Sequence, residues 1–86
     1  MRVRDWKPSQ KNSLCGFFTL ILPSGLIIHD VMLFEKNGSR WINLPSRKFI
    51  DKQGKEGFKP ILEFIGRTVS ENFRDQVLKA LDRSRS

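Results

Sequence analysis

The dipeptide Asn37-Gly38 limits the folds open to this chain more than any other part of its sequence. Both central positions of a type I′ turn have positive φ, which asparagine and glycine adopt at least cost. A two-residue turn here makes residues 31–36 and 39–44 antiparallel partners. The cross-strand pairs are then Glu35 with Arg40, Phe34 with Trp41, Leu33 with Ile42 and Val31 with Leu44. Because opposite charges and aromatic rings stabilise facing positions, the sequence predicts an antiparallel hairpin in this register.

Other turn signals divide the rest of the 86-residue chain into short strands. Pro23-Ser24-Gly25 suits a tight turn, since proline fixes its own φ and glycine accepts positive φ. With three residues in that turn, Leu22 faces Leu26 and Thr19 faces His29. Residues 45–58 are polar and basic, and we expect an exposed loop there. Strands are expected at residues 2–7, 14–22, 26–35, 40–44 and 59–65.

A helix is expected after Gly66, because Thr68 and Glu71 have the spacing of a capping box. Apolar residues then recur at three- and four-residue intervals and form one stripe: Val69, Phe73, Val77, Ala80 and Leu81. Residues 83–86 are expected to form a polar tail. The sequence thus predicts one α+β domain over residues 1–86. Its small antiparallel sheet, a meander of four to five strands, carries one C-terminal helix on one face.

Both faces of the predicted sheet are apolar, although the sequence provides a single helix. In the predicted registers one face carries Cys15, Phe17, Thr19, Ile21, Ile27, His29, Val31, Leu33, Ile42 and Leu44, and the other carries Phe18, Leu20, Leu22, Leu26, Ile28, Asp30, Met32, Phe34, Trp41 and Asn43. One helix covers one face at most, and a large exposed apolar patch marks an interaction site. We therefore expect a homodimer that buries Ile28, Met32, Phe34 and Trp41. The alternative is that the N-terminal strand or the 45–58 loop covers this face.

Composition excludes several classes of protein. The single cysteine, Cys15, cannot form an intrachain disulfide, and with one histidine it cannot supply a structural zinc site. No apolar run is long enough to cross a bilayer, and no signal-like segment opens the chain. These features predict a cytoplasmic protein with no membrane partner, no metal and no cofactor.

No catalytic residue is predicted. His29 and Asp30 are adjacent in a strand, so their side chains point to opposite faces and cannot form a dyad. We expect His29 to be a structural residue bonded to Thr19 or to the backbone, and Cys15 to be a small buried apolar side chain. We therefore expect neither an enzyme nor a small-molecule substrate.

Positive charge is the strongest indication of a partner. The chain has 16 lysines and arginines against 9 acidic residues, a net charge of +7, and nucleic acid is the usual partner of a small basic domain. Phe49 and Phe58 lie among the basic residues, where they would either stack on unpaired bases or anchor the loop to the core. The sequence leaves single- and double-stranded targets, and DNA and RNA, open. The residues expected to meet phosphates are Arg47, Lys48, Lys52, Lys55 and Lys59, with Arg74, Lys79 and Arg83 in the helix.

An aliphatic strand with His29-Asp30, then a turn, a short apolar strand and Leu44-Pro45-Ser46-Arg47, resembles the stage V sporulation protein G family of bacterial regulators, also called septation proteins. Pro60-Ile61 and a helix with Phe73, Val77 and Leu78 follow in the same order, so the resemblance covers residues 15–82. The resemblance implies an α+β fold that dimerises through its sheet and binds DNA, in some members RNA, as a regulator.

The resemblance also implies roles for single residues. His29 and Asp30 would serve the fold or the dimer, and Arg47 would contact a phosphate. The basic residues near the C-terminal helix that would bind nucleic acid are Arg74, Lys79 and Arg83. We therefore expect a dimeric nucleic-acid-binding regulator. The alternative is a protein-interaction or assembly module that uses its apolar sheet face and has no enzymatic activity.

Overall fold

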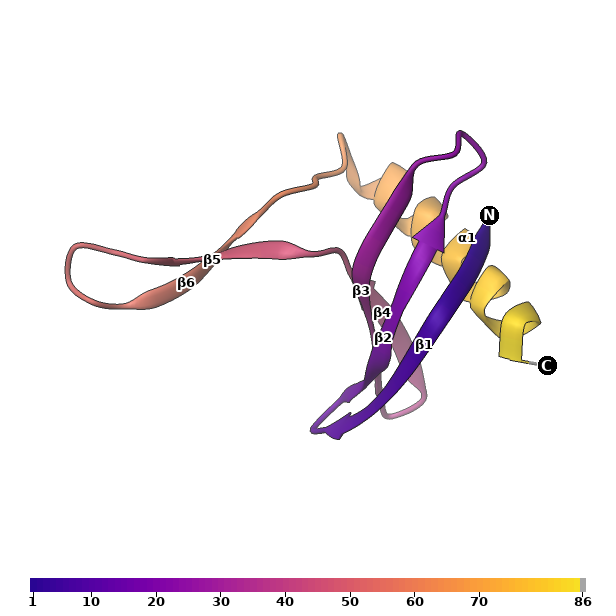
Figure 1. Cartoon of the computed structure of the whole chain (residues 1–86), viewed down its shortest axis with the longest axis horizontal. Coiled ribbons are helices and arrows are strands. Elements are labelled where there is room, and N and C mark those ends of the chain that lie inside the picture. Colours follow the sequence, from indigo (N-terminus) through magenta and orange to yellow (C-terminus); the bar gives the residue numbers. More distant parts are fainter. Residues whose placement is uncertain (86) are drawn as a thin grey trace.

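The main sheet contains four antiparallel strands in chain order: β1 (Arg2–Lys11), β2 (Leu14–Ile21), β3 (Ile27–Lys36) and β4 (Ser39–Asn43). Two further strands, β5 (Ser46–Ile50) and β6 (Glu56–Pro60), pair only with each other, and the helix α1 (Arg67–Arg85) follows. This computed structural model describes residues 1–85 (Figure 1). The predicted α+β architecture, a strand meander with one C-terminal helix, is confirmed.

The hairpin at Asn37-Gly38 has the predicted turn and register. Both residues have positive φ, 53° and 81°, as a type I′ turn requires. The pairs Glu35 with Arg40, Phe34 with Trp41 and Leu33 with Ile42 are all present. The fourth predicted pair, Val31 with Leu44, lies beyond the ladder, which ends where Met32 faces Asn43.

A β-bulge in β3 overturns the predicted sorting of residues between the two faces. The pair of Ile21 with Ile27 has the predicted register, but the register shifts by one residue between Leu20 and Phe18. Asp30, with φ of 59°, is at this bulge. The extra residue puts Ile28 and Val31 on the same face, and both are buried in the core. Ile28 is therefore not available to the predicted dimer interface.

A similar bulge in β1 brings two more residues to the core. Its register shifts between Arg4 and Lys7, and Asp5, with φ of 58°, lies between them. Val3 and Trp6, three residues apart, consequently both pack against the core. A Cβ on Gly16 would lie 2.8 Å from the Trp6 ring, so glycine is required where this ring crosses β2. β1 also extends well beyond the predicted residues 2–7.

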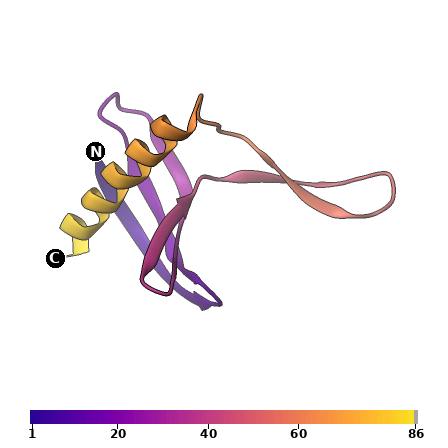
Figure 2. The same cartoon turned by 180° about the vertical axis from the view of Figure 1, so that it is seen from behind.

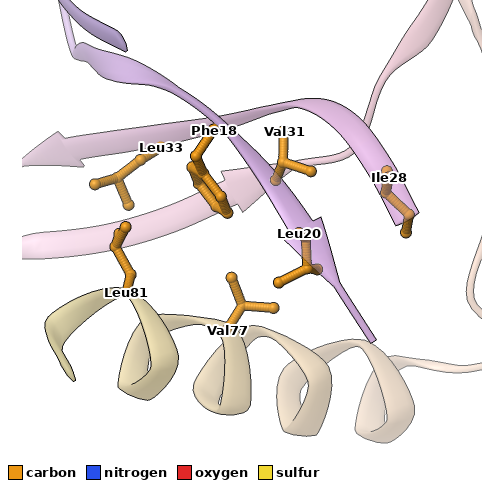
Figure 3. Close-up of a cluster of buried hydrophobic side chains, with 7 residues drawn as sticks. All are labelled: Phe18, Leu20, Ile28, Val31, Leu33, Val77 and Leu81. Atoms are coloured by element: carbon orange, nitrogen blue, oxygen red, sulfur yellow. The ribbon is translucent and has the colours of Figure 1, made fainter. Parts of the chain in front are cut away.

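The helix packs against one face of the sheet (Figures 1 and 2). Val77 and Leu81 point from α1 toward the apolar side chains of β2 and β3, and each is fully buried (Figure 3). Burying such a side chain stabilises the fold by about 1.5–3 kcal/mol. The sheet residues that meet them are Phe18, Leu20, Ile28, Val31 and Leu33.

The ends of the helix differ from the expectation. The predicted capping box is absent: Glu71 accepts a 2.9 Å hydrogen bond from Arg67 Nε, and the Gly66 carbonyl accepts the first helical bond from Ser70 N at 3.1 Å. The helix continues through Arg85, so the predicted polar tail at 83–86 is helical as far as the described residues extend. Ser86 lies outside them. Within residues 1–85, no helix is both long and apolar enough to cross a lipid bilayer.

A bidentate ion pair fastens the edge of the sheet to the helix. Arg40 on β4 donates from Nη1 and Nη2 to the two carboxylate oxygens of Asp82, at 2.7 and 3.0 Å. This hydrogen bonding raises the pKa of Arg40 above its ordinary value. A bidentate pair requires both side chains to keep one relative orientation, so it holds the C-terminal half of α1 against β4.

Candidate nucleic-acid interface

The most prominent feature of the molecule is a two-stranded arm, defined as residues 46–60, that projects from the body formed by β1–β4 and α1 (Figures 1 and 2). The expected exposed loop at 45–58 is thus a β-hairpin, and the expected strand at 59–65 is limited to the last residues of β6. The sequence signal for this hairpin is the turn Asp51–Lys55, which contains Gly54 with φ of 79°.

The register of the arm separates its side chains into two unlike faces. Ser46 faces Pro60, Arg47 faces Lys59, and the pairing continues to Ile50 and Glu56. Because facing residues share a side of the ribbon and sides alternate along a strand, two sets result. The cationic face carries Arg47, Phe49, Gly57 and Lys59. The opposite face carries Ser46, Lys48, Ile50, Glu56, Phe58 and Pro60.

Two like charges face each other on the cationic face. Arg47 and Lys59 are direct cross-strand neighbours, and within residues 1–85 neither has a salt-bridge partner. The Lys59 ammonium lies 5.2 Å from the centroid of the Phe49 ring, a cation–π contact. Like charges directly opposite each other destabilise a β-ribbon. This face therefore presents positive charge that the described part of the protein does not neutralise.

The opposite face of the arm is electrically balanced. Lys48 Nζ lies 3.2 Å from Glu56 Oε1 and forms an ion pair with it. Phe58 and Ile50 beside this pair are 71% and 67% exposed. Lys48, which the sequence groups with the other phosphate-binding candidates, is thus on the wrong side of the ribbon to act with Arg47 and Lys59.

The two phenylalanines of the arm have different environments. The Phe49 ring lies against Gly57, where a Cβ would be 2.8 Å from ring carbons, and Lys59 lies over the ring. Phe49 therefore anchors the arm to itself rather than to the main core. Phe58 is exposed on the opposite face and lines a cleft at the base of the arm.

The tip of the arm adds two exposed cations in a turn that is stabilised by hydrogen bonds. Lys52 and Lys55 flank Gln53-Gly54 and are both exposed. The Asp51 carboxylate accepts 2.8 Å hydrogen bonds from the backbone N–H groups of Gln53 and Lys55. The tip and the cationic face together carry four of the five predicted phosphate-binding residues of the arm, Lys48 being the exception.

The basic residues of the helix form a separate group. Arg74 is half-buried at the cleft and donates to Asp75 Oδ1 at 3.1 Å, whereas Lys79 and Arg83 are exposed, one turn apart in the C-terminal half of α1. That half of α1 and the arm lie at opposite ends of the molecule in Figure 1. A single chain therefore leaves Lys79 and Arg83 apart from the arm cations, whereas Arg74 lies at the base of the arm.

A cleft of about 520 Å³ lies where the arm joins the body. Its lining includes Met32, Trp41, Leu44, Phe58, Phe64 and Arg74. On the sheet face away from the helix, Phe34 and Trp41 stack with ring centroids 5.4 Å apart and an interplanar angle of 5°. Met32, Phe34 and Trp41 are half-buried, so this face, which we call the open face, is only partly covered.

His29 has the structural environment that the sequence predicts, whereas Cys15 is less buried than expected. His29 Nδ1 lies 3.4 Å from the Thr19 hydroxyl oxygen, which is hydrogen-bonding distance. Cys15 is half-buried and packs against the core, with its Sγ 3.7 Å from the Ser13 carbonyl oxygen. The expected bond between His29 and Thr19 is therefore confirmed.

Comparison with known proteins does not assign this arrangement to a class: no protein-family model, no curated protein and no solved structure matches the chain. Membership of the septation protein family accordingly stays a prediction from the sequence. The distribution of charge on the arm is then the feature from which function has to be inferred.

Proposed function

We propose that the protein is a cytoplasmic, dimeric nucleic-acid-binding protein that holds phosphates with the cationic face and the tip of its arm. The observation that supports this proposal best is the facing pair Arg47 and Lys59, which has no carboxylate partner in the described residues. An isolated two-stranded ribbon is marginally stable. A polyanion placed between the two cations removes their repulsion, so the ligand stabilises the element that binds it.

Three further observations agree with this function. The net charge of +7 attracts polyanions over a long range. Lys52 and Lys55 extend the positive surface to the tip of the arm. The resemblance of residues 15–82 to a family of bacterial nucleic-acid-binding regulators points to the same partner and to a regulatory role.

The homodimer in this proposal uses the open face. Met32, Phe34 and Trp41 lie on the side of the sheet that α1 leaves uncovered, and a second copy would complete their burial. Ile28 takes no part, because the bulge at Asp30 places it in the core. Two copies would present two arms to one nucleic acid, which raises the overall affinity through a high effective concentration.

The salt dependence of binding tests the function. Fluorescence anisotropy is measured with the wild-type protein and labelled 20-nucleotide DNA and RNA, single- and double-stranded, between 50 and 300 mM KCl. The slope of log K against log salt concentration is about −0.7 to −0.9 for each phosphate that the protein neutralises. The four arm cations set the steepest slope at roughly −3 for each engaged arm, which is reached when all four meet phosphates. Absence of binding to all four probes at 50 mM KCl would contradict the proposal.

One observation favours a second candidate, a protein-interaction or assembly module. Ile61 and Ile65, in the segment between the arm and α1, are 63% and 97% exposed, and Leu62 and Phe64 of the same segment line the cleft. Such residues suit a contact with another protein. Light scattering separates the candidates: a stable homodimer that binds nucleic acid favours the first, and a monomer that binds none of the probes favours the second.

A further inference from the structure

We propose that the arm enters the major groove of B-form DNA with its cationic face toward the base edges, and that Arg47 and Lys59 read guanine there. This inference rests on the proposed function, and it adds the class of nucleic acid and the residues that recognise it.

The dimensions of the arm suit this groove. Neighbouring strands lie about 4.8 Å apart, and the major groove, about 12 Å wide, admits a two-stranded ribbon. β5 and β6 each contain five residues, which corresponds to a ribbon about 17 Å long. The arm projects from the body in both views, so its cationic face can approach a duplex without rearrangement of the sheet (Figures 1 and 2).

The tip of the arm holds a fixed shape. Besides the two bonds to the Asp51 carboxylate, Asp51 N–H donates to the Lys55 carbonyl oxygen at 2.9 Å and Gly54 N–H donates to the Asp51 carbonyl oxygen at 3.1 Å. A turn fixed by four hydrogen bonds loses little conformational entropy on binding. Insertion into a groove of set width favours such a preformed element.

The aromatic residues of the arm argue against single-stranded nucleic acid, and the shape of the RNA major groove argues against duplex RNA. Single-stranded nucleic acid is held by stacking on open rings, but the Phe49 ring lies between Gly57 and Lys59. Phe58 is open, yet it is on the opposite face, where the ion pair of Lys48 with Glu56 leaves no net positive charge to hold a phosphate. The major groove of duplex RNA is too deep and narrow for side chains to read. B-form DNA is the target that remains.

Arg47 and Lys59 have the chemistry to recognise a base. Both present only donors, and guanine presents two acceptors, N7 and O6, in the major groove. Because the two residues are cross-strand neighbours on one face, both can reach the same or adjacent base pairs. Lys48 carries the same charge on the same arm but on the opposite face, paired with Glu56. It is therefore a matched control.

The first experiment compares three probes of one mixed sequence with the full-length protein: a 20-bp DNA duplex, its single strand and the corresponding RNA duplex. We expect the DNA duplex to bind at least about tenfold more tightly than the other two. Equal or tighter binding of single-stranded DNA or of the RNA duplex would overturn the groove assignment and leave nucleic-acid binding intact. Failure to bind any of the three, together with failure to bind single-stranded RNA, would instead contradict the proposed function.

The second experiment tests the reading residues. Arg47→Gln and Lys59→Gln are each expected to weaken duplex DNA binding about tenfold, and Lys48→Gln less than twofold. Circular dichroism and amide exchange of the arm check that each variant keeps its fold. An equal loss in Lys48→Gln and Lys59→Gln would mean that charge alone matters, and would overturn the proposal.

The third experiment identifies the groove. Duplexes that the wild-type protein selects from a random pool should share a guanine position. Replacing that guanine by 7-deazaguanine, which lacks the N7 acceptor, should weaken binding of the wild-type protein about tenfold. The variant that lacks the side chain in contact with N7, either Arg47→Gln or Lys59→Gln, should lose no further affinity on this replacement. Selection without a shared guanine, or indifference of the wild-type protein to 7-deazaguanine, would overturn base reading by the arm.

Discussion

At the scale of single residues, two aspartates determine which side chains reach the core. Asp5 and Asp30 both have φ near 60°, a region that asparagine and aspartate tolerate better than most residues. Each lies at a β-bulge, and in each case residues three apart then share the buried face. Without the bulge in β3, alternation from Ile28 would direct Asp30 and Met32 toward the helix in place of Val31 and Leu33.

Substitution at Asp30 tests this role. Asp30 is exposed, so its replacement changes backbone preference more than packing. Asp30→Val should lower the free energy of unfolding by about 1–2 kcal/mol, because a β-branched residue is strained at positive φ. Asp30→Gly, the matched control, should change it by less than about 1 kcal/mol. Urea unfolding measures both, and a Val variant as stable as the Gly variant would show that the bulge is not held by this residue.

At the scale of elements, the sequence predicts what local turn chemistry determines. Asn37-Gly38 and Pro23-Ser24-Gly25 gave the correct registers next to their turns. The bulges could not be predicted, because an aspartate within a strand looks the same in the sequence whether its φ is negative or positive. The arm was missed because its turn is stabilised by the Asp51 side chain rather than by an Asn-Gly pair.

For the candidate site, the sequence indicates which basic residues are candidates but not how they are arranged in space. The basic residues of the arm were identified from charge alone. Their division between two faces follows from alternation once β5 and β6 are known to pair, and that pairing separates Arg47 and Lys59 from Lys48. In a single chain the helix cations Lys79 and Arg83 lie apart from the arm, because the arm points away from the C-terminal half of α1 (Figure 1).

Removal of the arm tests whether it is independent of the body. Ser46 and Pro60 face each other, so an Asn-Gly turn can replace residues 47–59 and close the chain. The shortened protein should keep cooperative thermal unfolding, with a change in unfolding free energy below about 1 kcal/mol, since the core contains no arm residue. Its affinity for DNA should fall below detection in anisotropy titrations. Undiminished DNA binding would place the interface elsewhere.

At the scale of the whole molecule, the open face of the sheet leads to a prediction about assembly. Light scattering should give roughly 20 kDa for the wild-type protein, twice the 10.0 kDa of one chain. Met32→Lys should shift this mass to that of one chain with an unchanged circular dichroism spectrum, because a charge cannot be buried unpaired in an apolar interface. Leu26→Lys, at an exposed turn residue, is the control and should stay dimeric. A wild-type protein that is monomeric at every concentration would exclude the dimer.

The separation of arm and body has a consequence for how such a protein can change over time. The side chains of the arm are absent from the core, so substitutions on its cationic face leave the sheet and helix undisturbed. Under the proposed function, the nucleic-acid sequence that the arm prefers could therefore change without any intermediate that fails to fold. The same property makes the arm a practical graft site, where a new hairpin can be installed between Ser46 and Pro60 on an unaltered scaffold.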